Sequence, residues 1–145
     1  MRACLRIGFL FFWVSLLPAA GHGRTTVFET VDDDDARLLS AILAPRIELY
    51  AKRGALIAVF ANPGDGESSS VASALAGRLR DHGFTVGSAA GGQIEKEIAI
   101  FVSVKQLTYG VWVRVLAGQH RLYFLFARQP QGGLELFKET RIAVK

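Results

Sequence analysis

The sequence predicts an α+β domain, with helices packed on one face of a mixed, largely antiparallel sheet and a cleaved signal peptide in front of it. Three observations support this prediction. The first 23 residues have the pattern of an export signal. Residues 34–86 alternate between helical periodicity and short apolar runs, and residues 98–144 form a series of strand-like segments separated by short polar turns.

The N-terminal segment predicts export. Arg2 and Arg6 precede an apolar run at residues 7–17, and small residues follow Pro18. Cleavage after Gly21 and cleavage after Gly23 both suit a signal peptidase, so both alternatives stay open. A spanning anchor needs about 20 apolar residues, which favours a cleaved signal over an uncleaved anchor.

We expect three parts: a signal peptide at 1–23, an extended N-terminal segment at 24–33 and a single α+β domain at 34–145. The only cysteine, Cys4, lies in the signal and precedes its apolar run, so neither a disulfide nor a lipid anchor is expected. Loss of two arginines lowers the formal net charge from +4 to +2, which argues against a nucleic-acid partner. Periplasmic or secreted localisation follows, with no membrane span after cleavage.

Four aspartates, residues 32–35, precede the first helical pattern at residues 36–43. Carboxylates stabilise the N-terminal end of a helix by ~0.3–1 kcal/mol each, so this run predicts a helix start. Calcium binding is the alternative, but the run lacks the ligand spacing and the glycine of a calcium loop. Pro45 should end or kink the helix, and residues 46–53 suggest a second short helical segment closed at Gly54.

Residues 55–61 are continuously apolar and predict a strand in the middle of the sheet. After a polar loop at 62–67, in which Asp65 or Ser68 should accept backbone hydrogen bonds, a helix is predicted up to His82. Its apolar stripe consists of Val71, Leu75 and Leu79. Gly83 should close this helix in a left-handed conformation, and residues 84–86 should begin the next strand.

The remaining chain predicts four strands, at residues 98–104, 110–116, 122–126 and 134–144. Their connections are short and polar, and residues 118–120 carry the clearest hairpin signal. Strands in this order favour a largely antiparallel arrangement with the helices on one side.

The order of these segments resembles a group of bacterial envelope assembly domains. Val59-Phe60 at a strand end, a helix from Ser68 to Leu79 and the return Gly83-Phe84-Thr85-Val86 are similar to a pattern in flagellar outer-membrane-associated, curli-secretion-like and penicillin-binding-protein-activator proteins. The resemblance spans residues 34–127 and implies a non-enzymatic assembly or regulatory role. The chain lacks the lipobox cysteine of many such proteins, which argues against anchoring in the outer membrane.

We expect no catalytic, cofactor-binding or metal-binding residues and no enzymatic activity. The loop at 64–68 lacks the lysine and spacing of a phosphate-binding loop, and it does not match the nucleophile elbow G-x-S-x-G. The three histidines have no metal-ligand spacing. Glu95 and Glu97 would share one face of an extended segment, where a solvated strand start explains them better than acid–base chemistry does.

One surface carries the candidate site. In an extended strand Val111, Val113 and Val115 point to one face, while Trp112 and Arg114 point to the other. Trp and Arg often anchor binding interfaces, so these two are the candidate partner-binding residues. In the alternative interpretation, Trp112 packs across the sheet on Phe124 or Phe126 and covers the second face.

Two functional classes stay open. The first is an exported, non-enzymatic interaction domain that supports a bacterial cell-envelope or surface assembly, with an envelope protein as partner. The alternative is a small ligand- or glycan-binding module that uses the aromatic and basic strands near Trp112. A hydrolase is a third, weaker alternative. Partner capture from envelope extracts and binding to a glycan array distinguish the first two.

Overall fold

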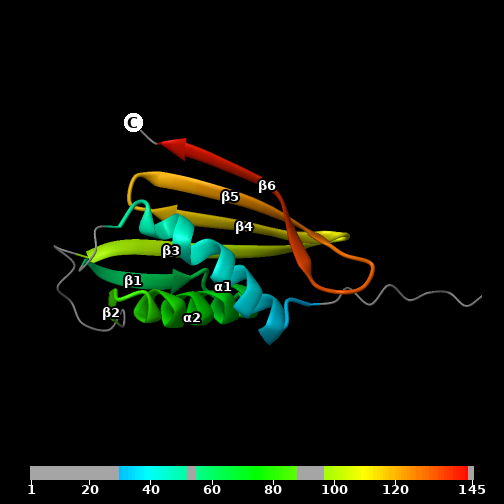
Figure 1. Ribbon diagram of the computed structural model, residues 1–145, viewed down its shortest axis with the longest axis horizontal. Coiled ribbons are helices and arrows are strands. Elements are labelled where there is room, and N and C mark those ends of the chain that lie inside the picture. Colours follow the sequence, from blue (N-terminus) through cyan, green and yellow to red (C-terminus); the bar gives the residue numbers. More distant parts are fainter. Residues whose placement is uncertain (1–29, 52–54, 88–96, 144–145) are drawn as a thin grey trace, which may run out of the picture.

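A six-stranded sheet with two helices on one of its faces forms the fold, as a computed structural model shows (Figure 1). The structure describes residues 30–51, 55–87 and 97–143. The predicted signal peptide and most of the segment at 24–33 lie outside these residues. The elements are α1 (Asp33–Glu48), β1 (Leu56–Ala61), α2 (Gly66–Asp81), β2 (Thr85–Gly87), β3 (Glu97–Leu107), β4 (Gly110–Ala117), β5 (His120–Arg128) and β6 (Leu134–Ala143).

The strand order is β2-β1-β3-β4-β5-β6. β1 is parallel to both β2 and β3, whereas β3, β4, β5 and β6 each pair antiparallel with the next strand along the chain. The prediction of a mixed, largely antiparallel sheet is therefore confirmed. β1 is hydrogen-bonded on both sides, as expected of an apolar strand, but it lies one strand in from the edge rather than in the middle.

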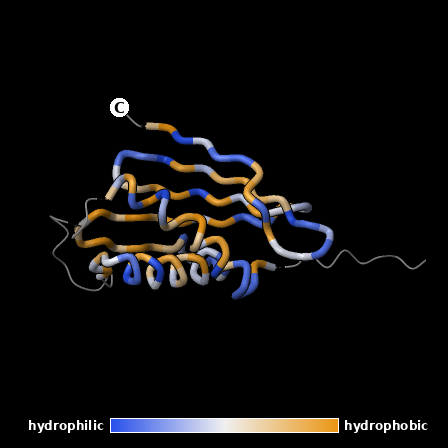
Figure 2. The backbone as a smooth tube through the Cα atoms, in the orientation of Figure 1, coloured by the Kyte–Doolittle hydropathy of each residue, from blue (hydrophilic) through white to orange (hydrophobic). Residues whose placement is uncertain are grey.

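The core lies between the helices and the sheet. Leu39, Leu43 and Ile47 of α1 are fully buried, and so are the predicted stripe residues of α2, among them Leu75. β1 and much of β3 are hydrophobic along their length (Figure 2). The strand residues that face the helices and are fully buried are Ile57, Ile100, Val102, Val111, Val113, Val115, Leu122, Phe124 and Phe126.

The acidic run at residues 32–35 begins α1 as predicted. Asp32 is the N-cap, and its side chain accepts a hydrogen bond from the backbone N–H of Asp35 at 2.7 Å. The expected end at Pro45 is wrong, because α1 continues through Pro45 to Glu48. Pro45 is exposed on the outer side of the last turn, while its neighbour Ala44 and the following Ile47 are fully buried. Packing of this turn outweighs the lost backbone hydrogen bond.

The start and end of α2 agree with the predicted caps. Asp65 is the N-cap and accepts hydrogen bonds from the backbone N–H groups of Glu67 and Ser68, and Gly83 has φ +87° after the last turn. Ser68 is fully buried. Its hydroxyl donates to Asp65 Oδ2 and accepts a hydrogen bond from the backbone N–H of Val104 at 2.8 Å. α2 is thereby attached to β3.

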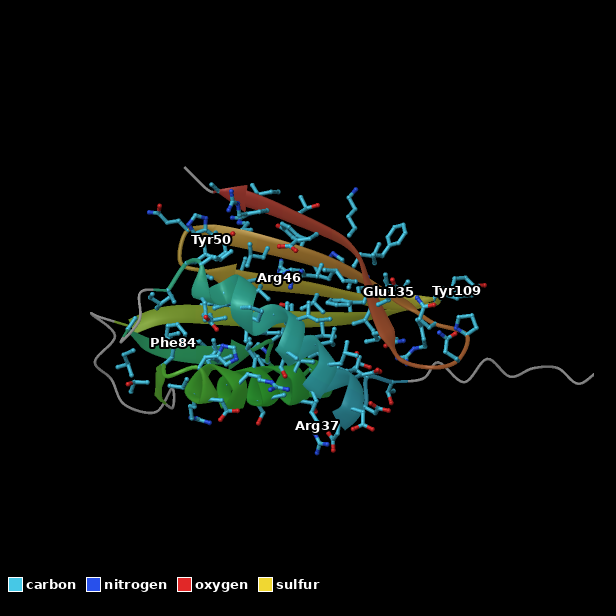
Figure 3. The ribbon with its side chains drawn as sticks, in the orientation of Figure 1. Arg37, Arg46, Tyr50, Phe84, Tyr109 and Glu135 are labelled. Carbon is cyan, nitrogen blue, oxygen red and sulfur yellow. The ribbon has the colours of Figure 1, made fainter. Side chains whose placement is uncertain are left out.

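α1 is attached to the last two strands by polar contacts. Arg46 Nε lies 2.7 Å from Glu139 Oε2, and Arg128 lies 2.8 Å from Asp35 Oδ2. Arg46 extends from α1 over the sheet (Figure 3) and its guanidinium lies over the ring of Phe124. Within the described residues, neither helix combines the length and the apolar character that crossing a membrane requires.

Candidate functional site

The face of the sheet opposite the helices has no described element over it. We call it the open face, and it includes Phe60, Phe101, Ser103, Lys105, Trp112, Arg114, Leu116, Arg121, Tyr123, Leu125, Lys138, Thr140 and Ile142 and, in the row beyond, Leu107, Ala127 and Glu135. Along β4 the buried valines alternate with half-buried residues of this face. The predicted orientation of Trp112 and Arg114, away from the helices, is therefore confirmed.

The alternative interpretation, in which Trp112 packs on Phe124 or Phe126, is wrong. Both phenylalanines are fully buried on the helix side of β5. The ring of Trp112 instead lies beside the ring of Tyr123 on the open face, with the two centroids 6.0 Å apart. A side chain from β5 thus supports the indole on the same surface, and the indole stays partly exposed.

The strand register arranges the open face in rows that run across β3, β4, β5 and β6. The rows are Lys105–Trp112–Leu125–Lys138, Ser103–Arg114–Tyr123–Thr140 and Phe101–Leu116–Arg121–Ile142. Side chains in one row are about 4.8 Å apart from strand to strand, and successive rows are about 6.6 Å apart. These three rows contain four cationic side chains and no carboxylate, so positive charge gathers on this face.

Arg114 lies in the middle of this surface. Its Nη2 donates a hydrogen bond to Ser103 Oγ at 3.3 Å, and its buried Nε has no hydrogen-bond partner among the described residues. The carboxylate of Glu135 lies one row beyond Lys138, opposite Ala127, where it accepts a hydrogen bond from the side chain of Gln129. The charge of Arg114 is therefore not neutralised by a neighbouring carboxylate in these rows.

Two hollows mark the open face. A small one, of about 200 Å³, lies beside Trp112 and Tyr123 and is also lined by Lys138 and Thr140. A larger trough, of about 620 Å³, lies where β3 and β4 meet. It is lined by Gln106, Leu107, Thr108, Tyr109, Gly110, Leu125, Phe126, Ala127 and Phe137.

The trough exists because β4 and β5 have little side-chain volume there. Gly110 pairs with Ala127, and a Cβ atom on Gly110 would lie 2.0 Å from the carbonyl oxygen of Phe126. Tyr109, at the tip of the hairpin (Figure 3), is 83 % exposed, and Phe137, at the register shift of β6, is 73 % exposed. This trough was not predicted from the sequence. The feature that could have indicated it is Tyr109, an aromatic residue directly before Gly110.

The histidines His82 and His120 lie away from the open face. His82 pairs with Glu48, and the ring of His120 packs on that of Tyr50 at 4.5 Å. Hydrogen bonding to the Tyr50 hydroxyl raises the pKa of Arg141 above its ordinary value. In the described ranges, no three His, Cys, Asp or Glu side chains gather as metal ligands would. Glu95 lies outside those ranges.

Comparison with known proteins finds no similar protein. No family model matches the chain, and neither a curated protein nor a solved structure matches it. The resemblance to bacterial envelope assembly domains therefore rests on the sequence pattern of residues 34–127, and it stays a prediction.

Proposed function

We propose that this chain is an exported, non-enzymatic interaction domain that binds an acidic surface of an envelope protein through its open face, in support of a cell-envelope or surface assembly. The observation that carries the proposal is the composition of the three rows. They hold four cations and the rings of Trp112 and Tyr123, with no carboxylate among them.

The pairing of charges distinguishes the two sides of the sheet. On the helix side, Arg46 pairs with Glu139 and Arg128 pairs with Asp35, so these cations serve the fold. Among the described residues, the four cations of the open face form no ion pair; they are Lys105, Arg114, Arg121 and Lys138. Cations without such partners attract an acidic surface and accelerate its association, in a way that weakens with salt.

Aromatic and basic side chains together suit a protein partner. Trp112 offers partly exposed apolar area on this face, and Arg114 offers a planar donor one row away. Residues of these two types are enriched among the anchors of protein–protein interfaces, where each commonly contributes more than ~2 kcal/mol. The export signal predicted at residues 1–23 supports a partner in the envelope.

A glycan or another small ligand is the second candidate, and the small hollow beside Trp112 favours it. The aromatic ring of Trp112 can stack on a sugar. The hydroxyl of Thr140 and the ammonium of Lys138, which line the same hollow, can form hydrogen bonds to it. Its volume of about 200 Å³ is below the ~300–1,000 Å³ of typical ligand pockets, which favours the protein partner.

A direct test uses tryptophan fluorescence. The chain has two tryptophans, and Trp13 lies in the predicted signal, so a Trp13→Phe variant reports on Trp112 alone. Titration with poly-glutamate should change its emission, with an apparent affinity that falls as salt rises. Poly-lysine should leave the emission unchanged. An equal response to both polymers would contradict the acidic partner.

The partner itself is tested by capture from envelope extracts. Trp112→Ala with Arg114→Ala should abolish capture while the thermal transition stays within a few degrees of the unmodified protein. Arg80→Ala, which removes an exposed cation from α2, is the matched control and should leave capture unchanged. Retained capture by the double variant would remove the open face from consideration, and binding on a glycan array without protein capture would favour the second candidate.

A further inference from the structure

The long edge of the sheet is β6. Strand β6 spans Leu134–Ala143 and hydrogen-bonds on one side, to β5, whereas the opposite edge of the sheet is the three-residue strand β2. Figure 1 shows β6 as the outermost strand, with none of the described elements beyond it. A strand edge of this length exposes a row of backbone N–H and C=O groups that another strand can pair with.

The side chains of β6 allow a second copy of this strand to be the partner. Two antiparallel copies of the strand can be related by a two-fold axis normal to the sheet. Residues that face each other then have their side chains on the same side of the sheet. One residue therefore lies at the axis and faces the same residue of the second copy. The residues after the register shift near Phe137 form the regular part of the strand, and three of the five are charged. They are Lys138, Glu139, Thr140, Arg141 and Ile142.

The charges of these residues determine which of them can lie at the two-fold axis. An axis through Lys138, Glu139 or Arg141 would place that charge opposite itself in the second copy, and directly opposed like charges are destabilising. An axis through Ile142 would leave hardly any paired residues, because the strand ends at Ala143. An axis through Thr140 has neither defect.

With Thr140 at the centre, every facing pair is favourable or neutral. Glu139 faces Arg141 of the second copy, and Arg141 faces Glu139 of the second copy, so two opposite-charge pairs form on the helix side, in addition to the contacts of Glu139 with Arg46 and of Arg141 with the Tyr50 hydroxyl within each copy. On the open face Thr140 faces Thr140 of the second copy, and Lys138 packs its alkyl stem beside Ile142 of the second copy, a residue that is 49 % exposed in the monomer.

We infer that two copies of this chain associate through antiparallel pairing of their β6 strands, centred on Thr140. The two sheets then continue into each other, and their open faces lie side by side on one surface. The facing stretch is short, and interfaces of small area belong to weak, transient complexes. The dimer should therefore form in a concentration-dependent way. The inference does not depend on what the open face binds.

Sedimentation tests the association. The full chain should shift from monomer towards dimer over a roughly hundredfold rise in concentration, as mass action requires. Arg141→Glu places like charges opposite each other twice and should abolish the shift. Arg80→Glu, a charge reversal at an exposed position of α2 away from the β6 edge, is the matched control and should leave it unchanged. A chain that stays monomeric at every concentration would overturn the inference.

Cysteine cross-linking tests the register, in a Cys4→Ser background that leaves no other cysteine. Thr140→Cys should form a disulfide dimer readily on mild oxidation, because directly facing Cα atoms lie within the ~4.4–6.8 Å that a disulfide spans. Lys138→Cys and Ile142→Cys should not cross-link to themselves, since the same residue of the second copy lies about 13 Å along the strand.

A mixture of Lys138→Cys and Ile142→Cys chains should nevertheless cross-link, because these two positions face each other in this register. Equal cross-linking of all three single variants would indicate random collision and would overturn the register. The three positions are exposed, so thermal transitions close to that of the parent chain are expected and verify that each variant folds.

Discussion

Replacement of Ser68 by alanine tests the link between α2 and the sheet. β1 ends at Ala61, which pairs with Val102, so the backbone N–H of Val104 lies beyond the end of β1. The buried hydroxyl of Ser68 accepts this hydrogen bond at 2.8 Å and donates its own proton to the Asp65 carboxylate. In Ser68→Ala the Val104 N–H stays buried without that partner.

An unsatisfied buried donor costs ~1–3 kcal/mol, and a hydrogen bond to a charged group contributes ~1.5–3 kcal/mol. Because both involve one hydroxyl and are not additive, we expect the free energy of unfolding to fall by about 2–4 kcal/mol, out of the ~5–15 kcal/mol typical of a domain. Urea denaturation followed by circular dichroism measures this change. The dependence on urea concentration should stay the same, because the surface exposed on unfolding does not change.

The neighbouring serine supplies the control. Ser69 is exposed, and its hydroxyl donates to the backbone carbonyl of Asp65 at 3.0 Å. Ser69→Ala should change the free energy of unfolding by no more than about 0.5 kcal/mol. Equal effects of the two substitutions would refute the reasoning, because Ser68 would then contribute nothing through Val104.

Three further predictions concern the core, the sheet and the N-terminus. Leu75→Ala should lower the free energy of unfolding by ~2–5 kcal/mol, since Leu75 is fully buried; a loss near zero in urea denaturation would contradict its place in the core. Gly110→Ala should strongly lower the midpoint temperature of thermal unfolding, because the added Cβ would lie 2.0 Å from a backbone oxygen. Gly77→Ala is the control: the position has open space around it, so the substitution should stabilise α2 by about 0.5–1 kcal/mol. Exported protein should begin at His22 or Arg24, and N-terminal sequencing that finds an intact start would instead indicate an anchor.

The sequence predicts well the features that depend on neighbouring residues. The helix start in the aspartate run 32–35, the left-handed Gly83 and the hairpin turn at residues 118–120 follow from local backbone chemistry, and the structure has all three. The orientation of Trp112 follows from the period of a strand. Pro45 is the exception, because burial of Ile47 against the sheet, which is a tertiary contact, keeps the last turn of α1 helical.

Features that depend on pairing between distant segments could not be predicted. The rows of the open face follow from a register that joins four strands, and the trough depends on the small residues Gly110 and Ala127 lying opposite each other. The role of Ser68 requires β3 to extend past the end of β1. A serine near a helix start signals a cap, but it carries no information about a strand residue more than thirty positions away.

The two ion pairs of α1 affect the order in which the chain can fold. Each joins residues 93 positions apart, Arg46 to Glu139 and Asp35 to Arg128, so α1 makes these contacts only with β5 and β6. The hairpins of β3 to β6 form between sequence neighbours and close short loops quickly. α1 can pack on α2 as soon as α2 has formed, but its ion pairs with β5 and β6 form only when synthesis approaches the C-terminus. A growing chain therefore cannot complete its core early, and for the export that residues 1–23 predict this delay keeps the chain unfolded for longer.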